Sequence, residues 1–241
     1  MINADKYVDS LSKRPINEYI ANVSGLLENV IVGGKGMPFF CPSPDSLAYV
    51  TNPGIHYFDY AAHVLRVSGV KSAGWQCRAI ELLKISLAFS KPKNIVYANN
   101  YLLSTNPSLN ISTQDAKEII DFSSVNYPGH ALLVRSISSS PLTSKQTWDS
   151  LNESGFKYIF NRKVFYADYR TLPSKLPKIL REDLNLIGKG PVAYIEDAPL
   201  GMIDFDTIAN LYNRLYIYKH SQHNLKLSAD WFRVAAETNH V

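Results

Sequence analysis

The sequence predicts an α/β protein, and three observations support this fold class. Segments with the helical spacing of apolar residues alternate along the chain with short extended apolar runs. Apolar residues make up 46% of the 241 residues and charged residues 19%, a composition that excludes disorder, collagen and coiled coil. No segment approaches the roughly 18 consecutive apolar residues of a membrane span.

The first half of the chain is predicted to contain two helices separated by irregular structure. A short helix is expected over 5–14, because Pro15 stops it. Glycines and prolines at 33–54 favour turns that interrupt short strands such as VIV and LAYV. Apolar residues crowd most faces of 74–90, which indicates a largely buried helix, and the alternation at 94–104 predicts a strand.

The second half repeats the alternation of helices and strands. We expect strands over 130–137, 156–169 and 191–197, the second being either one strand or a hairpin. We expect helices over 115–122, 143–153 and 176–187, and one that begins at Asp204 or Asp206. Gly155 stands where a left-handed carboxy-terminal cap is needed, and the final segment, 228–241, is also expected to be helical.

Charge and cysteine content limit the class of protein. Twenty-five Lys and Arg against 21 Asp and Glu give a net charge of +4, which does not by itself indicate nucleic-acid binding. Two cysteines are too few for a disulfide scaffold, and the polar amino terminus lacks the apolar core of a signal peptide. We therefore expect a single domain over 1–241 in the cytoplasm.

Several familiar site motifs are incomplete. The glycine clusters at 33–36 and 187–191 lack the spacing of a phosphate loop and are interpreted as turns. His220 and His223 lie three residues apart, but no nearby carboxylate completes a metal site, so no metal is expected. No GxSxG elbow is present, and a cysteine hydrolase would need Cys41 or Cys77 beside a histidine.

Fifteen tyrosines and a few arginines are the more informative residues. Tyr212 and Tyr216 lie one helical turn apart within LYNRLYIYKHSQHN at 211–224. They are either core residues with hydrated hydroxyls or the polar wall of a cleft for an anionic or peptidic ligand. Arg135 lies within an apolar run, so its charge either emerges at the sheet edge or meets a carboxylate.

Four segments resemble one family in the same order: HALLVRS at 130–136, GFKYIFNRKVFYAD at 155–168, REDL at 181–184 and LYNRLYIYKHSQHN at 211–224. Over this second half the chain is similar to bacterial GNAT-superfamily proteins of the Fem-like type. The resemblance implies a mixed central sheet flanked by helices, often as one half of a tandem architecture. It also implies transfer of an acyl or aminoacyl group from a thioester or tRNA ester to an amine. The pyrophosphate-binding pattern [RQ]xxGx[GA] of acyl-CoA-binding members is absent.

Amine acylation needs proton transfer, oxyanion stabilisation and a group that binds the substrate's charge. The resemblance and the residue types together nominate His130, Tyr212 and Tyr216 for proton handling. They nominate Arg135, Arg162, Arg214 and Lys219 for a substrate carboxylate or phosphate.

The implied cofactor is acyl-CoA, specifically acetyl-CoA. The implied acceptor is the amine of a small peptide, amino acid or cell-wall precursor, and tRNA as donor is the one nucleic acid that the family admits. A second GNAT-like domain or a homodimer stays open as a partner. Two alternatives also stay open: a non-catalytic GNAT-like binding or assembly module, which the missing phosphate motif favours, and a small hydrolase that uses a cysteine.

Overall fold

The computed structural model describes residues 4–67, 69, 72–87, 94–138, 142–161, 178, 181–182, 185 and 199–238. The chain forms two compact units, Met1–Phe156 with Asp204–Val241, and Lys157–Ile203. All of the strands below belong to the first unit.

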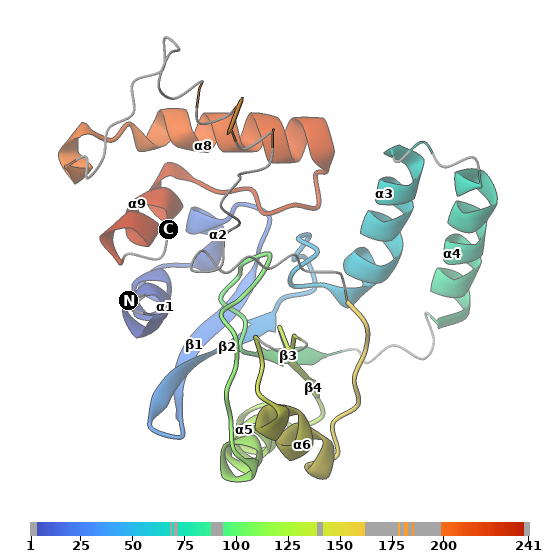
Figure 1. Cartoon of the computed structure of the whole chain (residues 1–241), viewed down its shortest axis with the longest axis vertical. Helices are drawn as coiled ribbons and strands as arrows, with labels where there is room; N and C mark the ends of the chain where they lie inside the picture. The colour runs from blue at the N-terminus through green and yellow to red at the C-terminus, as the bar shows by residue number, and fades with distance from the viewer. Residues whose placement is uncertain are drawn as a thin grey trace. The chain divides into compact units, whose positions relative to one another are not determined.

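A four-stranded mixed sheet forms the centre of the first unit (Figure 1). Its strands are β1 (Gly25–Val32), β2 (Lys35–Pro42), β3 (Ile95–Ala98) and β4 (Ala131–Val134), in that spatial order. β1 pairs antiparallel with β2, β2 pairs antiparallel with β3, and β3 pairs parallel with β4. The mixed α/β class is therefore confirmed.

The hairpin between β1 and β2 depends on two glycines. Gly33 and Gly34 have φ of 57° and 75°, the left-handed pair that a tight two-residue hairpin turn requires. The interpretation of the 33–36 glycine cluster as a turn is thus confirmed. The LAYV run at 47–50 lies outside any strand, so the strand expected there is wrong, because Ser46 to Thr51 form a loop held by its own hydrogen bonds.

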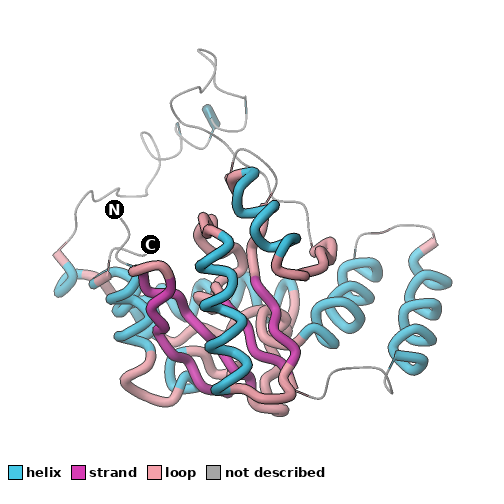
Figure 2. The backbone as a smooth tube through the Cα atoms, turned by 90° about the horizontal axis from the view of Figure 1, so that it is seen from below, coloured by secondary structure: helices cyan, strands magenta, loops and turns pink. Residues whose placement is uncertain are grey.

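Helices cover both faces of the sheet, as successive strand residues show. Phe40 and Tyr97 belong to one core with Tyr7 of α1 (Ala4–Leu11) and Trp231 of α9 (Ala229–Glu237), and α2 (Ile16–Tyr19) adds to that core. Phe39 belongs to a second core on the opposite face, with helices α5 (Thr113–Asn126) and α6 (Lys145–Glu153). Side chains alternate between the faces because a strand has a period of two. Figure 2 shows the strands lying between helices.

α5 is longer at both ends than the predicted 115–122, whereas the caps expected at Gly155 and Asp204 agree with the structure. α5 begins after Ser112, whose hydroxyl accepts from the Asp115 amide while the Asp115 carboxylate accepts from the Ser112 amide. α6 ends before Gly155, which has φ of 88° and provides the expected left-handed cap. Asp204, rather than Asp206, caps α8 (Phe205–Asn213) by accepting from the Thr207 amide.

Two π-helical segments extend ordinary helices. η1 (Ile55–Tyr60) leads into α3 (Ala61–Val67), and η4 (Arg214–His220) continues α8. Such segments often occur at functional sites.

The prediction of a largely buried helix at 74–90 is wrong in its burial. α4 (Ala73–Leu87) packs its inner side on α3 and η1, whereas its outer apolar side is exposed among the described residues. Apolar composition marks a surface that favours burial, but it does not show that another element covers it.

The remaining expectations fall wholly or partly outside the described residues. Residues 156–161 are not in a strand, and the rest of the strand predicted to 169 lies outside the description, as do the 191–197 strand and most of the 176–187 helix. The Lys157–Ile203 unit contributes the short η3 (Leu200–Met202). Within the described part of the chain, no helix has the length and apolarity needed to span a bilayer.

Candidate functional site

The parallel strands β3 and β4 end at one edge of the sheet, and unusual backbone conformations gather there. Ala98 pairs with Val134, the last residues of the two strands. Just beyond them, Asn99, Leu102 and Ser136 have φ of 58°, 56° and 63°. These are the non-glycine residues with positive φ in the described ranges, and each costs about 1–3 kcal/mol. Ligands of open α/β sheets bind outside the carboxyl ends of strands, so we call this region the carboxyl-edge site.

Asparagine amides hold the carboxyl-edge site together. Asn99 Nδ2 donates to the Arg135 carbonyl at 2.9 Å, and Asn106 Nδ2 donates to the Asn99 carbonyl at 2.8 Å. The backbone amide of Asn106 also donates to Ser136 Oγ at 3.3 Å. Asn106 is 6% exposed, and its Oδ1 has no hydrogen-bond partner among the described residues. A buried acceptor of this kind marks a place for a donor from water or a ligand.

Arg135 follows β4, is half-buried, and donates from its side chain to two loops, the one that contains Val50 and the one that follows β3. Its Nη1 donates to Asn100 Oδ1 at 2.8 Å, to the Val50 carbonyl at 3.1 Å and to the Leu103 carbonyl at 3.4 Å. The Arg135 amide donates to the Ala98 carbonyl and continues the ladder by one step. Arg135 thus stabilises the site's own loops.

Two tyrosines place their hydroxyls near the Arg135 guanidinium. Burial raises the pKa of Tyr57 and of Tyr97, and the nearby positive charge of Arg135 partly opposes that rise. Both phenols are therefore neutral at physiological pH and can donate hydrogen bonds.

An aromatic wall extends from this region. Tyr49 stacks on Tyr60 with ring centroids 4.7 Å apart, and His56 lies 5.5 Å from the Tyr49 ring. Tyr49 Oη donates to Ser104 Oγ at 2.7 Å, in the loop that follows β3. The wall therefore connects η1 to the carboxyl-edge site.

Tyr212 and Tyr216, both nominated from the sequence, lie beside this wall. Their rings are 4.6 Å apart, one helical turn from one another. Burial, with smaller contributions from Tyr49 and Tyr216, raises the pKa of Tyr212 to about 12. Tyr212 packs against the core that contains Tyr49 and Val50, and Arg135 donates to the Val50 carbonyl.

The chain was compared with models of protein families, with curated proteins and with solved structures. No match was found in any of the three. What the site can do chemically therefore follows from the residues that form it.

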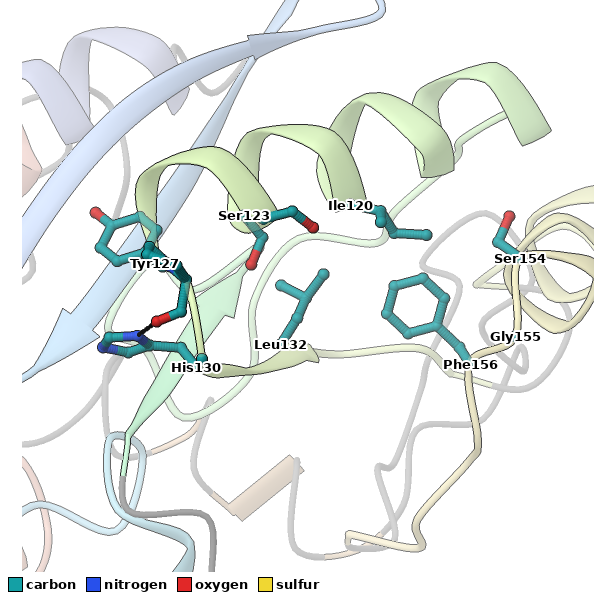
Figure 3. A pocket seen from close by; sticks show the side chains of 11 residues that line it. Ile120, Ser123, Tyr127, His130, Leu132, Ser154, Gly155 and Phe156 are labelled. Carbon is teal, nitrogen blue, oxygen red and sulfur yellow. Dashed lines mark hydrogen bonds between the residues drawn. The ribbon is translucent and has the colours of Figure 1, made fainter.

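His130 lies at the opposite end of β4. It precedes the strand and Arg135 follows it, so their Cα atoms are roughly 16 Å apart at about 3.3 Å per residue. His130 lines a separate cavity of about 440 Å³, in which Ile120, Leu132 and Phe156 face one another (Figure 3). The structure therefore does not bring His130 together with the nominated tyrosines and Arg135.

The other nominated cations are either exposed or outside the description. Arg214 and Lys219 lie on η4 with exposed side chains, and Arg162 lies outside the described residues. Arg214 and Lys219 belong to the same π-helical segment as Tyr216.

The amino terminus of α5 does not fit a pyrophosphate. The connection from β3 to α5, residues 99–112, contains no glycine, and the Asp115 amide is already bonded to Ser112 Oγ. The Asp115 carboxylate lies against Gly33, and Glu118 accepts from the Gly33 amide at 2.9 Å. Two carboxylates at this helix end repel an anion.

The cysteines lack the environment of a nucleophile. Burial and the Glu28 carboxylate raise the pKa of Cys41, and the buried Cys77 donates to the Ala62 carbonyl. A reactive cysteine needs a lowered pKa, so the hydrolase alternative loses its support. Tyr127 donates to the same Glu28.

Sequence reasoning missed the polar centre of the site. A signal was present, because Asn99 and Asn100 follow an apolar strand at once, and paired asparagines favour left-handed turns. Asn106 lies in the same loop, but nothing local links these asparagines to Arg135 or Ser136, which the parallel pairing of β3 and β4 brings near them.

Proposed function

We propose that the chain is a GNAT-like N-acyltransferase or aminoacyltransferase that acts at the carboxyl-edge site. The acceptor would be the amine of an amino acid, a small peptide or a cell-wall precursor. The observation that carries the proposal is the convergence of left-handed Asn99 and Ser136, Arg135 and neutral tyrosines at the carboxyl ends of two parallel strands. The proposal also rests on the resemblance over 130–224, a stretch that contains β4 and η4.

The reaction forms one bond and breaks one bond. The amine nitrogen attacks the carbonyl carbon of an ester or thioester, a C–N bond forms, and the C–O or C–S bond breaks. The proton lost by the amine balances the proton gained by the leaving alkoxide or thiolate. Neutral tyrosines at the site would donate hydrogen bonds that stabilise the oxyanion.

Each residue has a role that suits its environment. Tyr212 keeps its proton because its pKa is about 12, so it would donate a hydrogen bond to the developing oxyanion. Asn106 Oδ1 would accept from the amine, since it lacks a partner among the described residues. Arg135 would hold the loops in place, and Tyr57 would donate to the substrate.

The donor is constrained by α5. Asp115 and Glu118 do not suit a pyrophosphate, so acyl-CoA would not be held at that helix end in the usual way. This favours an aminoacyl ester as the donor. It also gives weight to the second candidate, a GNAT-like binding module that performs no acyl transfer.

A donor comparison tests the proposal. The purified chain is incubated with amino acids and dipeptides and with either acetyl-CoA or a pool of aminoacylated tRNA, and mass spectrometry detects acylated amines. The proposal expects a product with one donor, and expects Tyr57→Phe to reduce its rate while the matched control Tyr218→Phe, on an exposed tyrosine, leaves the rate unchanged. Absence of product with both donors would favour the binding module.

A further inference from the structure

Helix α4 presents an unusually apolar surface. Five large apolar side chains on α3 and α4 are more than half exposed among the described residues, and we call them the α3–α4 apolar face. They are Val67 (68%), Trp75 (65%), Leu82 (66%), Leu83 (55%) and Ile85 (65%). Trp75 and Leu82 are seven residues apart and share one stripe, because seven residues make two helical turns. A helix that is apolar on nearly all sides normally has a covering partner.

The inner side of α4 is already used for packing. Cys77 bonds to the Ala62 carbonyl on α3, and Lys84 forms an ion pair with Asp59 of η1. These contacts fix the rotation of α4 and turn Trp75 and Leu82 outward. The antiparallel pair α3 and α4 is visible in both Figure 1 and Figure 2.

The segment that contains α3 and α4 is basic, with Arg66, Arg78 and Lys84 on the helices themselves. Residues 61–94 contain six Lys and Arg and one Glu, a net charge of +5. The whole chain has a net charge of +4, so the other 207 residues together carry −1. Arg78 is exposed on α4 itself. An apolar face within a basic segment is complementary to a surface that is both apolar and negatively charged.

We propose that the α3–α4 apolar face binds the surface of a bilayer rich in anionic phospholipid. α4 has 15 residues, about 22 Å at 1.5 Å per residue, which is too short to cross a bilayer but suits a helix lying in its interface. Trp75 and the leucines would enter the boundary between headgroups and acyl chains, while Arg78 would contact phosphates. The inference is independent of acyl transfer, since none of these residues belongs to the carboxyl-edge site.

Vesicle co-sedimentation of the full chain tests this inference. The probes are vesicles of phosphatidylcholine alone and vesicles with about one third phosphatidylglycerol. We expect binding to the anionic vesicles, weak binding to the neutral ones, and loss of binding at high salt because salt screens the attraction. The fluorescence of exposed Trp75 should shift to shorter wavelength on binding.

Matched variants separate lipid binding from self-association. Leu82→Ser with Ile85→Ser should lower the partition coefficient at least tenfold, and Arg78→Glu should lower it on the order of tenfold. The control, Ile31→Ser with Val125→Ser, changes two equally exposed residues elsewhere and should leave binding unchanged. Failure to bind anionic vesicles would overturn the proposal. So would ultracentrifugation that shows a dimer which only Leu82→Ser with Ile85→Ser dissociates, because a second copy would then be the partner.

Discussion

Substitution of Arg135 by methionine separates a structural role from a ligand-binding role at the carboxyl-edge site. Methionine keeps an unbranched apolar stem but removes every N–H donor of the side chain. The change therefore deletes the contacts from Nη1 to Asn100 Oδ1, Val50 and Leu103 while preserving much of the packing.

The expected loss of stability follows from these contacts. One Nη1 carries two hydrogens, so at most two strong hydrogen bonds form at once, at 2.8 Å to Asn100 and 3.1 Å to Val50. Hydrogen bonds from a charged donor contribute about 1.5–3 kcal/mol each. Both acceptors keep a second partner, since Asn100 Oδ1 also accepts from the Leu102 amide and Val50 from Asn100 Nδ2. We therefore expect a loss of about 2–4 kcal/mol.

Urea denaturation measures this loss directly as a change in the free energy of unfolding. The melting temperature, measured separately by heating, should fall by roughly 4–16 °C for a chain of this size. Arg214→Met is the matched control on an exposed arginine, and its effect should stay within about 0.5 kcal/mol. An Arg135→Met variant as stable as the control would refute the structural role.

Three further predictions concern the turn, a tyrosine and a thiol. Gly33→Ala should destabilise the chain by about 2 kcal/mol or more, because its φ is +57° and the new Cβ would lie 2.2 Å from Asp115 Oδ1. The matched control is Gly34→Ala, whose Cβ would meet nothing within 4 Å. In chemical denaturation this control should cost only about 1 kcal/mol of unfolding free energy. The pKa of Tyr212 is about 12 in the folded chain against 10 in the unfolded chain, so its stabilising contribution is complete below pH 10 and is lost as pH rises toward 12. Tyr212→Phe should remove about 2 kcal/mol of this pH dependence of the unfolding free energy. The same pH dependence in the variant and in the parent chain would contradict the burial argument. Cys41 should react with iodoacetamide more slowly at neutral pH than free cysteine does, because its pKa is raised, and rapid labelling below neutral pH would contradict this.

Local signals in the sequence were sufficient for two of the helix ends. Gly155 caps α6 with φ of 88° and Asp204 caps α8, because both caps depend on a single residue and its neighbours. Burial was not predictable in the same way. The apolar residues of α4 indicated burial, but whether another element covers its outer side depends on the packing of the whole chain.

The candidate site was predicted only in part, for a related reason. Tyr212 and Tyr216 were found because a single helix places them together. His130 was chosen by residue type, yet a strand of four residues separates it from Arg135, so the two lie at opposite ends of β4. Asn106 was missed, since one of its two partners, Ser136, is 30 residues away along the chain.

Hydrogen exchange of the backbone amides tests most directly whether the carboxyl-edge site binds the acyl donor. The exchange is measured by mass spectrometry for the free chain and for the chain with acetyl-CoA, with coenzyme A and with aminoacylated tRNA. The account predicts slower exchange in peptides covering 99–106 and 135–138 with at least one of these donors, and unchanged exchange at the first turn of α5. Protection confined to α5 or to the cavity beside His130, or no protection with any donor, would contradict it.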